Sequence, residues 1–255
     1  MTLFETIAVA FSMFSAIPMP QFLWNEKNMR YVLCAFPLIG AVIGAICWGA
    51  WNICGLLGVS ALLRGAILTM IPVVITGGIH LDGYSDTCDA LASHASREKK
   101  QEILKDPHVG SFAVIRLCGY FVMTLALWTS LKAFPWATVL LSFCMSRTLS
   151  GLAVASFPLA KHTGLAHTFA QAADKKQVRT VLILLDVLLC GGMCLCGYEG
   201  LWMALAAHGV FGYYGWMSKK QFGGLSGDLA GWFLQTAELW MLLVLVIRQY
   251  VEVLI

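Results

Sequence analysis

Three aspartates lie within one short segment at the end of a long apolar stretch. They are Asp82, Asp86 and Asp89, in the sequence Gly-Gly-Ile-His-Leu-Asp-Gly-Tyr-Ser-Asp-Thr-Cys-Asp at 77–89. In a helix, a rotation of roughly 100° per residue places all three within about 60° of arc, on one face. Mg²⁺ is commonly held by one or two carboxylates together with substrate phosphates. The spacing therefore predicts a Mg²⁺ site; the alternative is an N-cap at Asp82 followed by a solvated acidic face.

Further polar residues stand in the connections between apolar segments. They are Lys105, Asp106 and His108; Lys161, His162, Gly164 and His167; and Gly223, Gly224, Gly227 and Asp228. Basic side chains bind phosphate, glycine lets the backbone approach a ligand closely, and a carboxylate can deprotonate a hydroxyl. Together these types favour phosphoryl-group transfer from a diphosphate donor. For Asp228 the alternative is a helix cap, and for Gly231 it is close helix packing.

His80 and Arg147 could join such a site only under particular local structures. On a continuous helix His80 points roughly away from the aspartate face, so it contributes only if it lies in a turn before a helix that starts near Asp82. Arg147 falls inside an apolar span, where a charge is costly and marks a functional candidate. It either reaches substrate phosphates or pairs with Asp186 or Glu238, and the sequence leaves both open.

The composition is that of an integral membrane protein. Of 255 residues, 59% are apolar and 12% are charged, and the mean hydropathy is +0.76. About 20 apolar residues cross a bilayer as a helix. Expected spans are 31–57, 61–81, 112–132, 135–158, 180–198, 200–217 and 232–254.

We therefore expect an all-α, polytopic transmembrane helical bundle with about six to seven spans, forming one domain over 1–255. A short N-terminal helix within Phe4–Ile17 is expected to be interfacial or partly inserted. Eight of the nine cysteines lie in apolar runs and are interpreted as buried thiols. We expect no nucleic-acid partner, and a homo-oligomer remains open.

The basic residues predict an orientation. Lys and Arg collect in cytoplasmic loops, and the expected spans place three basic connections on one side. These contain Arg97, Lys99, Lys100 and Lys105; Lys161, Lys175, Lys176 and Arg179; and Lys219 and Lys220. The opposite side receives Arg64, Lys132 and Arg248. The aspartate cluster is thus expected at the cytoplasmic membrane edge.

The segment 77–89 closely resembles the Gly-Gly-x-His-Leu-Asp-Gly-x-x-Asp-Thr-x-Asp motif of the bacterial cobalamin synthases, the adenosylcobinamide-GDP ribazoletransferases. Similar blocks follow in order along nearly the whole chain: Ile17-Pro18-Met19-Pro20, Phe36-Pro37-Leu38-Ile39-Gly40, Lys105-Asp106 with Gly110, Ser146-Arg147, Gly164-Leu165, and Gly223-Gly224 with Gly227-Asp228.

This resemblance implies a multi-pass enzyme of the bacterial inner membrane, with Mg²⁺ as cofactor, in late cobalamin biosynthesis. It would join adenosylcobinamide-GDP to α-ribazole or α-ribazole 5′-phosphate and release GMP. The chain departs from the family at His108, where an Arg is usual, and at Gln235, where a Glu is frequent. Gln235 cannot act as a general base.

On this basis we expect the following roles. Asp82 and Asp86 bind Mg²⁺, Asp89 binds a second ion or acts as base, and Asp228 completes the metal site or orients the nucleophile. Lys105 and Arg147 offset transition-state charge, and His80 is a further catalytic candidate. Substrate contacts are expected from Asp106, His108, Lys161, Gly164, Gly223, Gly224 and Gly227.

Two other classes of function are weighed against this one. CDP-alcohol phosphotransferases also place aspartates at a membrane edge, but Gly83 here is followed by Tyr-Ser-Asp and lacks that family's Arg. A transporter would use the aspartates as a coupling-ion site, and such sites tend to lie near the bilayer midplane on broken helices, often within paired repeats. The sequence shows no repeat.

Overall fold

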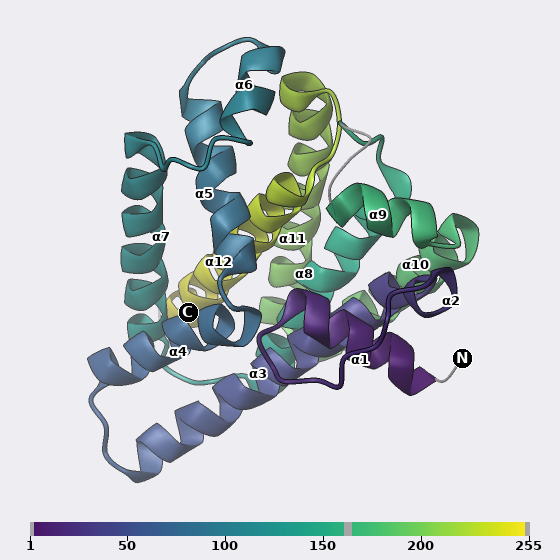
Figure 1. Cartoon of the computed structure of the whole chain (residues 1–255). Coiled ribbons are helices and arrows are strands. Elements are labelled where there is room, and N and C mark those ends of the chain that lie inside the picture. Colours follow the sequence, from purple (N-terminus) through teal and green to yellow (C-terminus); the bar gives the residue numbers. More distant parts are fainter. Residues whose placement is uncertain (1–2, 161–164, 253–255) are drawn as a thin grey trace.

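The computed structural model describes residues 3–160 and 165–252. Within these ranges the chain is a bundle of helices, as the composition predicts (Figure 1). The elements in order are α1 Leu3–Phe14, α2 Glu26–Met29, α3 Val32–Leu56, α4 Ala61–Thr76, α5 Ile79–Ala92, α6 Arg97–Ile103, α7 Ser111–Ser130, α8 Trp136–Ser156, α9 Leu165–Ala172, α10 Lys175–Leu195, α11 Tyr198–Met217, the π-helix η1 Ser218–Phe222 and α12 Gly227–Val251.

Five of the described helices are long and apolar enough to cross a membrane by themselves, namely α3, α7, α8, α10 and α12. The bent pair α4 and α5 brings the number to six if the pair counts as one span. Helix α11 coincides with the expected span 200–217 but is not apolar enough to be counted with the others. The structure thus supports a polytopic bundle and gives five or six such segments, against the six to seven expected.

The expected span 61–81 is not one helix. Helix α4 ends at Thr76, and α5 leaves it at an angle of 97°. Gly77 and Gly78 both have positive φ, at 64° and 79°. This left-handed conformation suits glycine and cannot continue a right-handed helix. The aspartates therefore belong to a separate helix after a break, rather than to the end of a continuous span.

Helix α5 packs closely against α12 through two glycines. A Cβ at Gly83 would fall 2.8 Å from the Cα of Asp228, and a Cβ at Gly231 would fall 2.7 Å from the carbonyl oxygen of His80. Helices in membranes approach closely where such small residues meet. This contact fixes Asp228 beside the aspartate face of α5, and it confirms the packing alternative for Gly231.

Two of the three predicted basic connections, those that contain α6 and η1, contact each other. Lys100 of α6 donates to Gln221 of η1 at 2.6 Å, and Arg97 donates to the Lys220 carbonyl at 3.3 Å. Leu225 pairs in turn with the segment after α8, donating to the Pro158 carbonyl at 2.8 Å. Near the C-terminus of α12, the Lys132 N–H donates to Gln249 near Arg248. These contacts agree with the predicted grouping for α6 and η1, and the orientation in the membrane stays a prediction.

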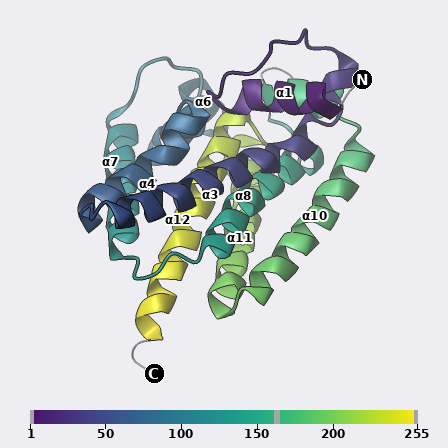
Figure 2. The same cartoon turned by 90° about the horizontal axis from the view of Figure 1, so that it is seen from below.

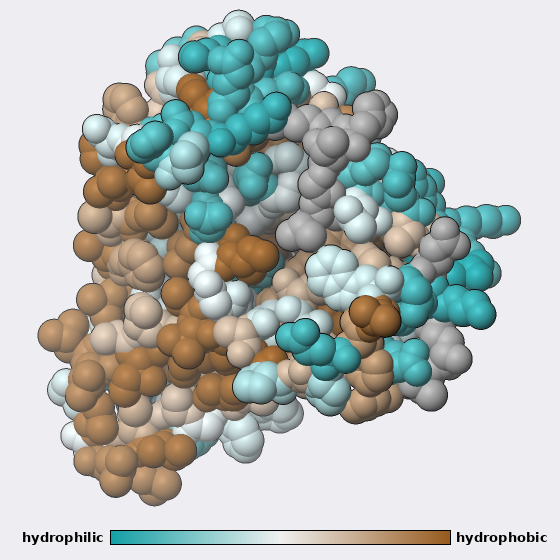
Figure 3. Space-filling model, in the orientation of Figure 1, coloured by the Kyte–Doolittle hydropathy of each residue, from teal (hydrophilic) through white to brown (hydrophobic). Residues whose placement is uncertain are grey.

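The surface agrees with this grouping. Figure 3 shows hydrophilic side chains over α6 and over α9 and α2, while hydrophobic side chains cover the surface of α3, α4 and α7. In the view from below, α3 crosses α8, and α10 lies beside α8 and α11 (Figure 2). Helix α1 packs its buried face, including Val9 and Phe11, onto α3.

Candidate active site

A cavity of about 480 Å³ opens where α5 and α12 meet α3, α8 and α9. Its walls include six of the polar and glycine residues that the sequence singled out: His80, Asp82, Lys105, His167, Gly227 and Asp228. They come from four separate parts of the chain. A volume of this size is typical of small-molecule sites, so the structure gathers these residues around a space that can hold a ligand.

The three aspartates of α5 share the open face of their helix. Asp82 is exposed and Asp86 and Asp89 are half-buried, whereas Leu81, Gly83–Ser85, Thr87, Cys88 and Ala90 are all buried. The negative charges of Asp82, Asp89 and Asp228 all act on the carboxyl group of Asp86. Like charges held together repel, and a cation near them would relieve the repulsion.

Neither capping alternative accounts for these acids. The N-cap of α5 is Gly78, and the Asp82 N–H donates to the Gly78 carbonyl at 3.0 Å within the first turn. The N-cap of α12 is Ser226, whose hydroxyl accepts from the Leu229 N–H at 3.3 Å. Asp82 and Asp228 thus stand in the first turns of two helices, where the helix dipole favours negative charge.

The donor set suits Mg²⁺ but is not a closed cage. The side chains offer carboxylate oxygens, the ligands of a hard cation, and come from Asp82, Asp86, Asp89 and Asp228. Among the described residues, however, no three of these aspartates bring ligand oxygens within 4.8 Å of one another. Asp82 and Asp228 line the cavity, while the Asp89 carboxylate lies against Gly110 at the start of α7, where a Cβ would fall 2.2 Å from both of its oxygens. Such an open arrangement leaves room for phosphate oxygens as further ligands.

His80 lines the cavity although it lies inside α5. The sequence admitted it only in a turn before the helix, but α5 begins at Ile79. His80 is 6% exposed, its ring centroid is 5.8 Å from that of Phe36, and its Nε2 has no hydrogen-bond partner among the described residues. An unpaired buried ring nitrogen beside a cavity is available to a ligand.

Lys105 lines the cavity, but its two polar neighbours do not. The Asp106 carboxylate accepts from the backbone N–H of His108 at 3.0 Å and contacts its ring Nδ1 at 2.7 Å, and both side chains are exposed. These contacts, the backbone one first, hold the pKa of Asp106 below its usual range. Substrate contact by Asp106 or His108 remains a prediction.

Gly223 and Gly224 shape the backbone next to the cavity. Both have positive φ, and a Cβ at Gly224 would fall 2.5 Å from the Ala160 nitrogen. They bring the strand-like contact between Leu159 and Leu225 close enough to form. Their structural part is to position Ser226–Asp228, and direct substrate contact stays a prediction. Lys161, His162 and Gly164 lie outside the described residues.

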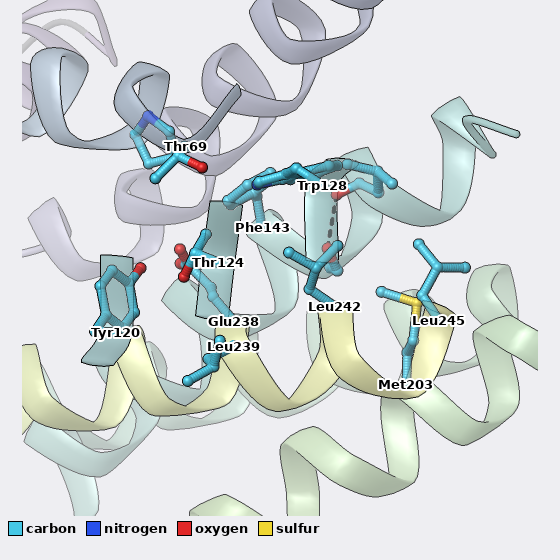
Figure 4. A pocket seen from close by; sticks show the side chains of 13 residues that line it. Thr69, Tyr120, Thr124, Trp128, Phe143, Met203, Glu238, Leu239, Leu242 and Leu245 are labelled. Carbon is cyan, nitrogen blue, oxygen red and sulfur yellow. Dashed lines mark hydrogen bonds between the residues drawn. The ribbon is translucent and has the colours of Figure 1, made fainter. Parts of the chain in front are cut away.

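Arg147 does not line the cavity. It is fully buried, and its guanidinium pairs with Glu238 of α12 and donates to the Ser146 hydroxyl at 2.9 Å. Glu238 also borders a second cavity of about 30 Å³, where it stands beside Tyr120 and Thr124 of α7 (Figure 4). Of the two alternatives left by the sequence, this geometry favours the ion pair with Glu238 over contact with substrate phosphates.

An aromatic wall of the main cavity escaped the sequence analysis. The Phe14 ring lies 4.4 Å from that of Phe36 and 5.0 Å from that of Phe169, and all three residues border the cavity. They come from α1, α3 and α9. In a chain this rich in apolar residues, no spacing distinguishes these rings from core phenylalanines.

Comparison with known proteins gives one consistent result. The model of a family described as cobalamin-5-phosphate synthase matches residues 6–246. An adenosylcobinamide-GDP ribazoletransferase of Lachnoclostridium phytofermentans is 43% identical, over 96% of this chain and 94% of the relative. Proteins of the same name from Clostridium botulinum strain Alaska E43 and Geobacillus sp. strain WCH70 are each 31% identical, with 93% and 90% of this chain covered and 95% and 90% of the relatives. No solved structure matches.

Proposed function

Because the chain belongs to the cobalamin-5-phosphate synthase family, we propose that the cavity between α5 and α12 is where its reaction takes place. The activity is that of an adenosylcobinamide-GDP ribazoletransferase of cobalamin biosynthesis. One observation carries the assignment of the site: Asp82, Asp228 and Lys105, from three separate segments, line one cavity that also has an aromatic wall.

The reaction is a substitution at phosphorus. A ribose hydroxyl of α-ribazole, or of its 5′-phosphate, forms a bond to the phosphorus that carries the cobinamide, and the bond from that phosphorus to GMP breaks. The hydroxyl proton passes to a carboxylate. We assign this base to Asp228, because it lines the cavity. Asp89, which the sequence offers as either a base or a ligand of a second ion, lies against Gly110. Lys105, an exposed cation in the cavity wall, offsets charge on the phosphates.

Asp82 and Asp86, one turn apart on α5, are the residues we propose for Mg²⁺, and Asp89 extends the same acidic face. Bound there, the ion would offset the charge of the diphosphate and of the departing GMP. The repulsion that Asp82, Asp228 and Asp89 exert on the Asp86 carboxylate supports this assignment, because a cation would offset it.

The cavity is large enough for one of the two substrates but not for both. About 480 Å³ suits a nucleoside such as α-ribazole, and Phe14, Phe36 and Phe169 provide an apolar, aromatic surface for its base. A corrinoid is far larger, so we place its ring outside the cavity with only the diphosphate reaching Asp82 and Lys105. Stacking against this wall would hold the ribose hydroxyl near Asp228.

We further propose that the protein lies in the bacterial inner membrane and that the cavity opens on its cytoplasmic side. Support comes from the basic connections, because Lys105, which lines the cavity, follows α6, and α6 contacts the basic segment Lys219–Lys220 through Arg97. The break between α4 and α5 resembles the broken helices of transporters. The family match over residues 6–246 nevertheless favours the enzyme over a transporter or a CDP-alcohol phosphotransferase.

The test is product formation by the purified full-length protein. Adenosylcobinamide-GDP, α-ribazole and Mg²⁺ are expected to give GMP and adenosylcobalamin in equal amounts, and Asp82→Ala to give neither. Phe169→Leu is expected to raise the KM for α-ribazole more than the KM for adenosylcobinamide-GDP. GMP formation by Asp82→Ala at the wild-type rate would contradict the site, and an equal rise in both KM values would contradict the aromatic surface.

A further inference from the structure

Three side chains of different ligand types meet between α10 and α11. Asp186 and Cys190 lie one turn apart on α10, and His208 comes from the middle of α11. Within the described residues this group alone has three candidate ligand atoms that all lie within 4.8 Å of one another. None of the three lines the substrate cavity. The cluster is therefore separate from the site described above.

The orientation of His208 is fixed by its own helix. Its Nδ1 lies 2.9 Å from the carbonyl oxygen of Ala204, which can only accept, so Nδ1 carries a proton. In the neutral ring, Nε2 then presents a lone pair toward the Asp186 Oδ2 at 3.1 Å. Two acceptors at this distance repel unless a proton or a cation joins them. A carbonyl bond to the other ring nitrogen is also the usual support of a metal-binding histidine.

The Asp186 carboxylate also lacks a partner for its second, buried oxygen among the described residues. Asp186 lies in the middle of an apolar helix suited to span a membrane, and its Oδ1 is buried with no hydrogen-bond partner in the part of the chain that the structure describes. A charge in such a place needs a compensating group. A divalent ion bound by one carboxylate, one thiolate and one neutral imidazole forms a neutral assembly, which lowers the cost of burying Asp186.

We propose that Asp186, Cys190 and His208 form a binding site for a divalent transition-metal ion of the zinc class, joining α10 to α11. Thiolate and imidazole select such an ion over Mg²⁺. Three protein ligands leave one position for water. On binding, the Cys190 thiol loses its proton to solvent and its sulfur forms the bond to the metal. The competing arrangement is a protonated His208 paired with Asp186, with Cys190 only packing.

Cobalt provides the test, because a thiolate bound to Co²⁺ gives a charge-transfer absorption that oxygen ligands do not. The metal-stripped full-length protein in detergent is titrated with Co²⁺. We expect the band to saturate at one equivalent, to disappear when Zn²⁺ is added and to persist in excess Mg²⁺. Cys190→Ser is expected to abolish it. Cys118 and Cys194 are exposed in the structure, although the sequence predicts buried thiols there, and Cys118→Ser and Cys194→Ser are expected to retain the band.

A folded wild-type protein without the band would overturn the proposal in favour of the His208–Asp186 ion pair. A band of full intensity in Cys190→Ser would overturn it equally. If Cys190→Ser does not fold, His208→Gln serves instead, with an expected loss of at least tenfold in Co²⁺ affinity; unchanged affinity would contradict the site. Because the cluster lies outside the substrate cavity, Cys190→Ser that folds is expected to keep its basal transferase activity.

Discussion

Gly83 on α5 and Asp228 on α12 approach so closely that a Cβ at Gly83 would fall 2.8 Å from the Asp228 Cα and 2.7 Å from its carbonyl oxygen. The atoms in the way belong to the backbone and cannot rotate aside. This contact places the carboxylate of α12 beside the aspartate face of α5. The close approach of Asp228 to Asp82 therefore requires a glycine, which has no Cβ, at position 83.

Gly83→Ala is expected to push α5 and α12 apart. Overpacking of this kind costs about 1–3 kcal/mol of unfolding free energy, and the displacement of Asp228 from Asp82 should lower kcat at least tenfold. Unfolding in detergent and GMP release measure the two effects. Gly119→Ala is the matched control, because Gly119 lies inside α7 with nothing within 4 Å of the added Cβ. Equal effects of both substitutions would contradict the role of the contact.

Asp82→Asn is expected to separate activity from stability. Removing one charge relieves the repulsion on Asp86, so the variant should unfold at the same temperature as the wild type or higher in Mg²⁺-free buffer. Its GMP release should nevertheless fall by at least a hundredfold. Glu102→Gln, an exposed acid on α6 outside the cavity lining, should change neither quantity. An Asp82→Asn protein that is both less stable and active would count against an acidic metal site.

Removal of Mg²⁺ should act through the same cluster. A ligand that binds the folded protein and not the unfolded chain stabilises the fold, and the gain rises with the logarithm of the free ligand concentration. Chelation should therefore lower the thermal midpoint of the wild type, and Mg²⁺ should restore it. Asp86→Asn should weaken this response, because its carboxylate is one of the two proposed ligands. The midpoint is followed by thermal unfolding in detergent. A response to Mg²⁺ that is equally large in Asp86→Asn would place the ion elsewhere.

The sequence predicts the acidic face well, because helical periodicity alone decides that Asp82, Asp86 and Asp89 point the same way. It fails at Gly77–Gly78. An uninterrupted apolar run predicts a continuous span, whereas two consecutive glycines permit the positive φ values that break it. The consequence is large, since the break turns α5 by 97° and brings His80 and Asp82 to the same cavity.

Contacts between distant segments are the part that local spacing cannot supply. The sequence leaves Arg147 with substrate phosphates, Asp186 or Glu238 as partners, and only the packing of α8 on α12 selects Glu238. In the same way, Asp186 and Cys190 show helical spacing, but His208 joins them only through the contact of α10 with α11. The phenylalanine wall of the cavity depends on three helices at once.

The ion pair between Arg30 and Asp174 predicts a pH dependence of stability. The Arg30 guanidinium, and next the backbone N–H of Gln177, hold the pKa of Asp174 below its ordinary value. A lowered folded-state pKa stabilises the fold above the unfolded-state value of about 3.9, and the effect is lost as the pH falls through the lowered pKa. Asp174→Asn retains a capping side chain for α10 but not the charge. Its thermal midpoint should therefore lie below that of the wild type at pH 7 and converge with it in acid.

The pair between Arg147 and Glu238 predicts a difference between single and double variants. Both side chains are almost fully removed from solvent, at 0% and 9% exposure. Glu238→Gln leaves the guanidinium buried without its counter-charge, which should cost about 3–5 kcal/mol of unfolding free energy. Replacing both, as in Arg147→Met with Glu238→Leu, should recover most of this loss, because two apolar side chains need no compensation. Glu238→Gln should also lower GMP release, because the packing of α8 on α12 is disturbed. Since Arg147 acts through the pair, the double variant should recover GMP release together with stability. A stable but inactive double variant would instead show that Arg147 serves the substrate directly.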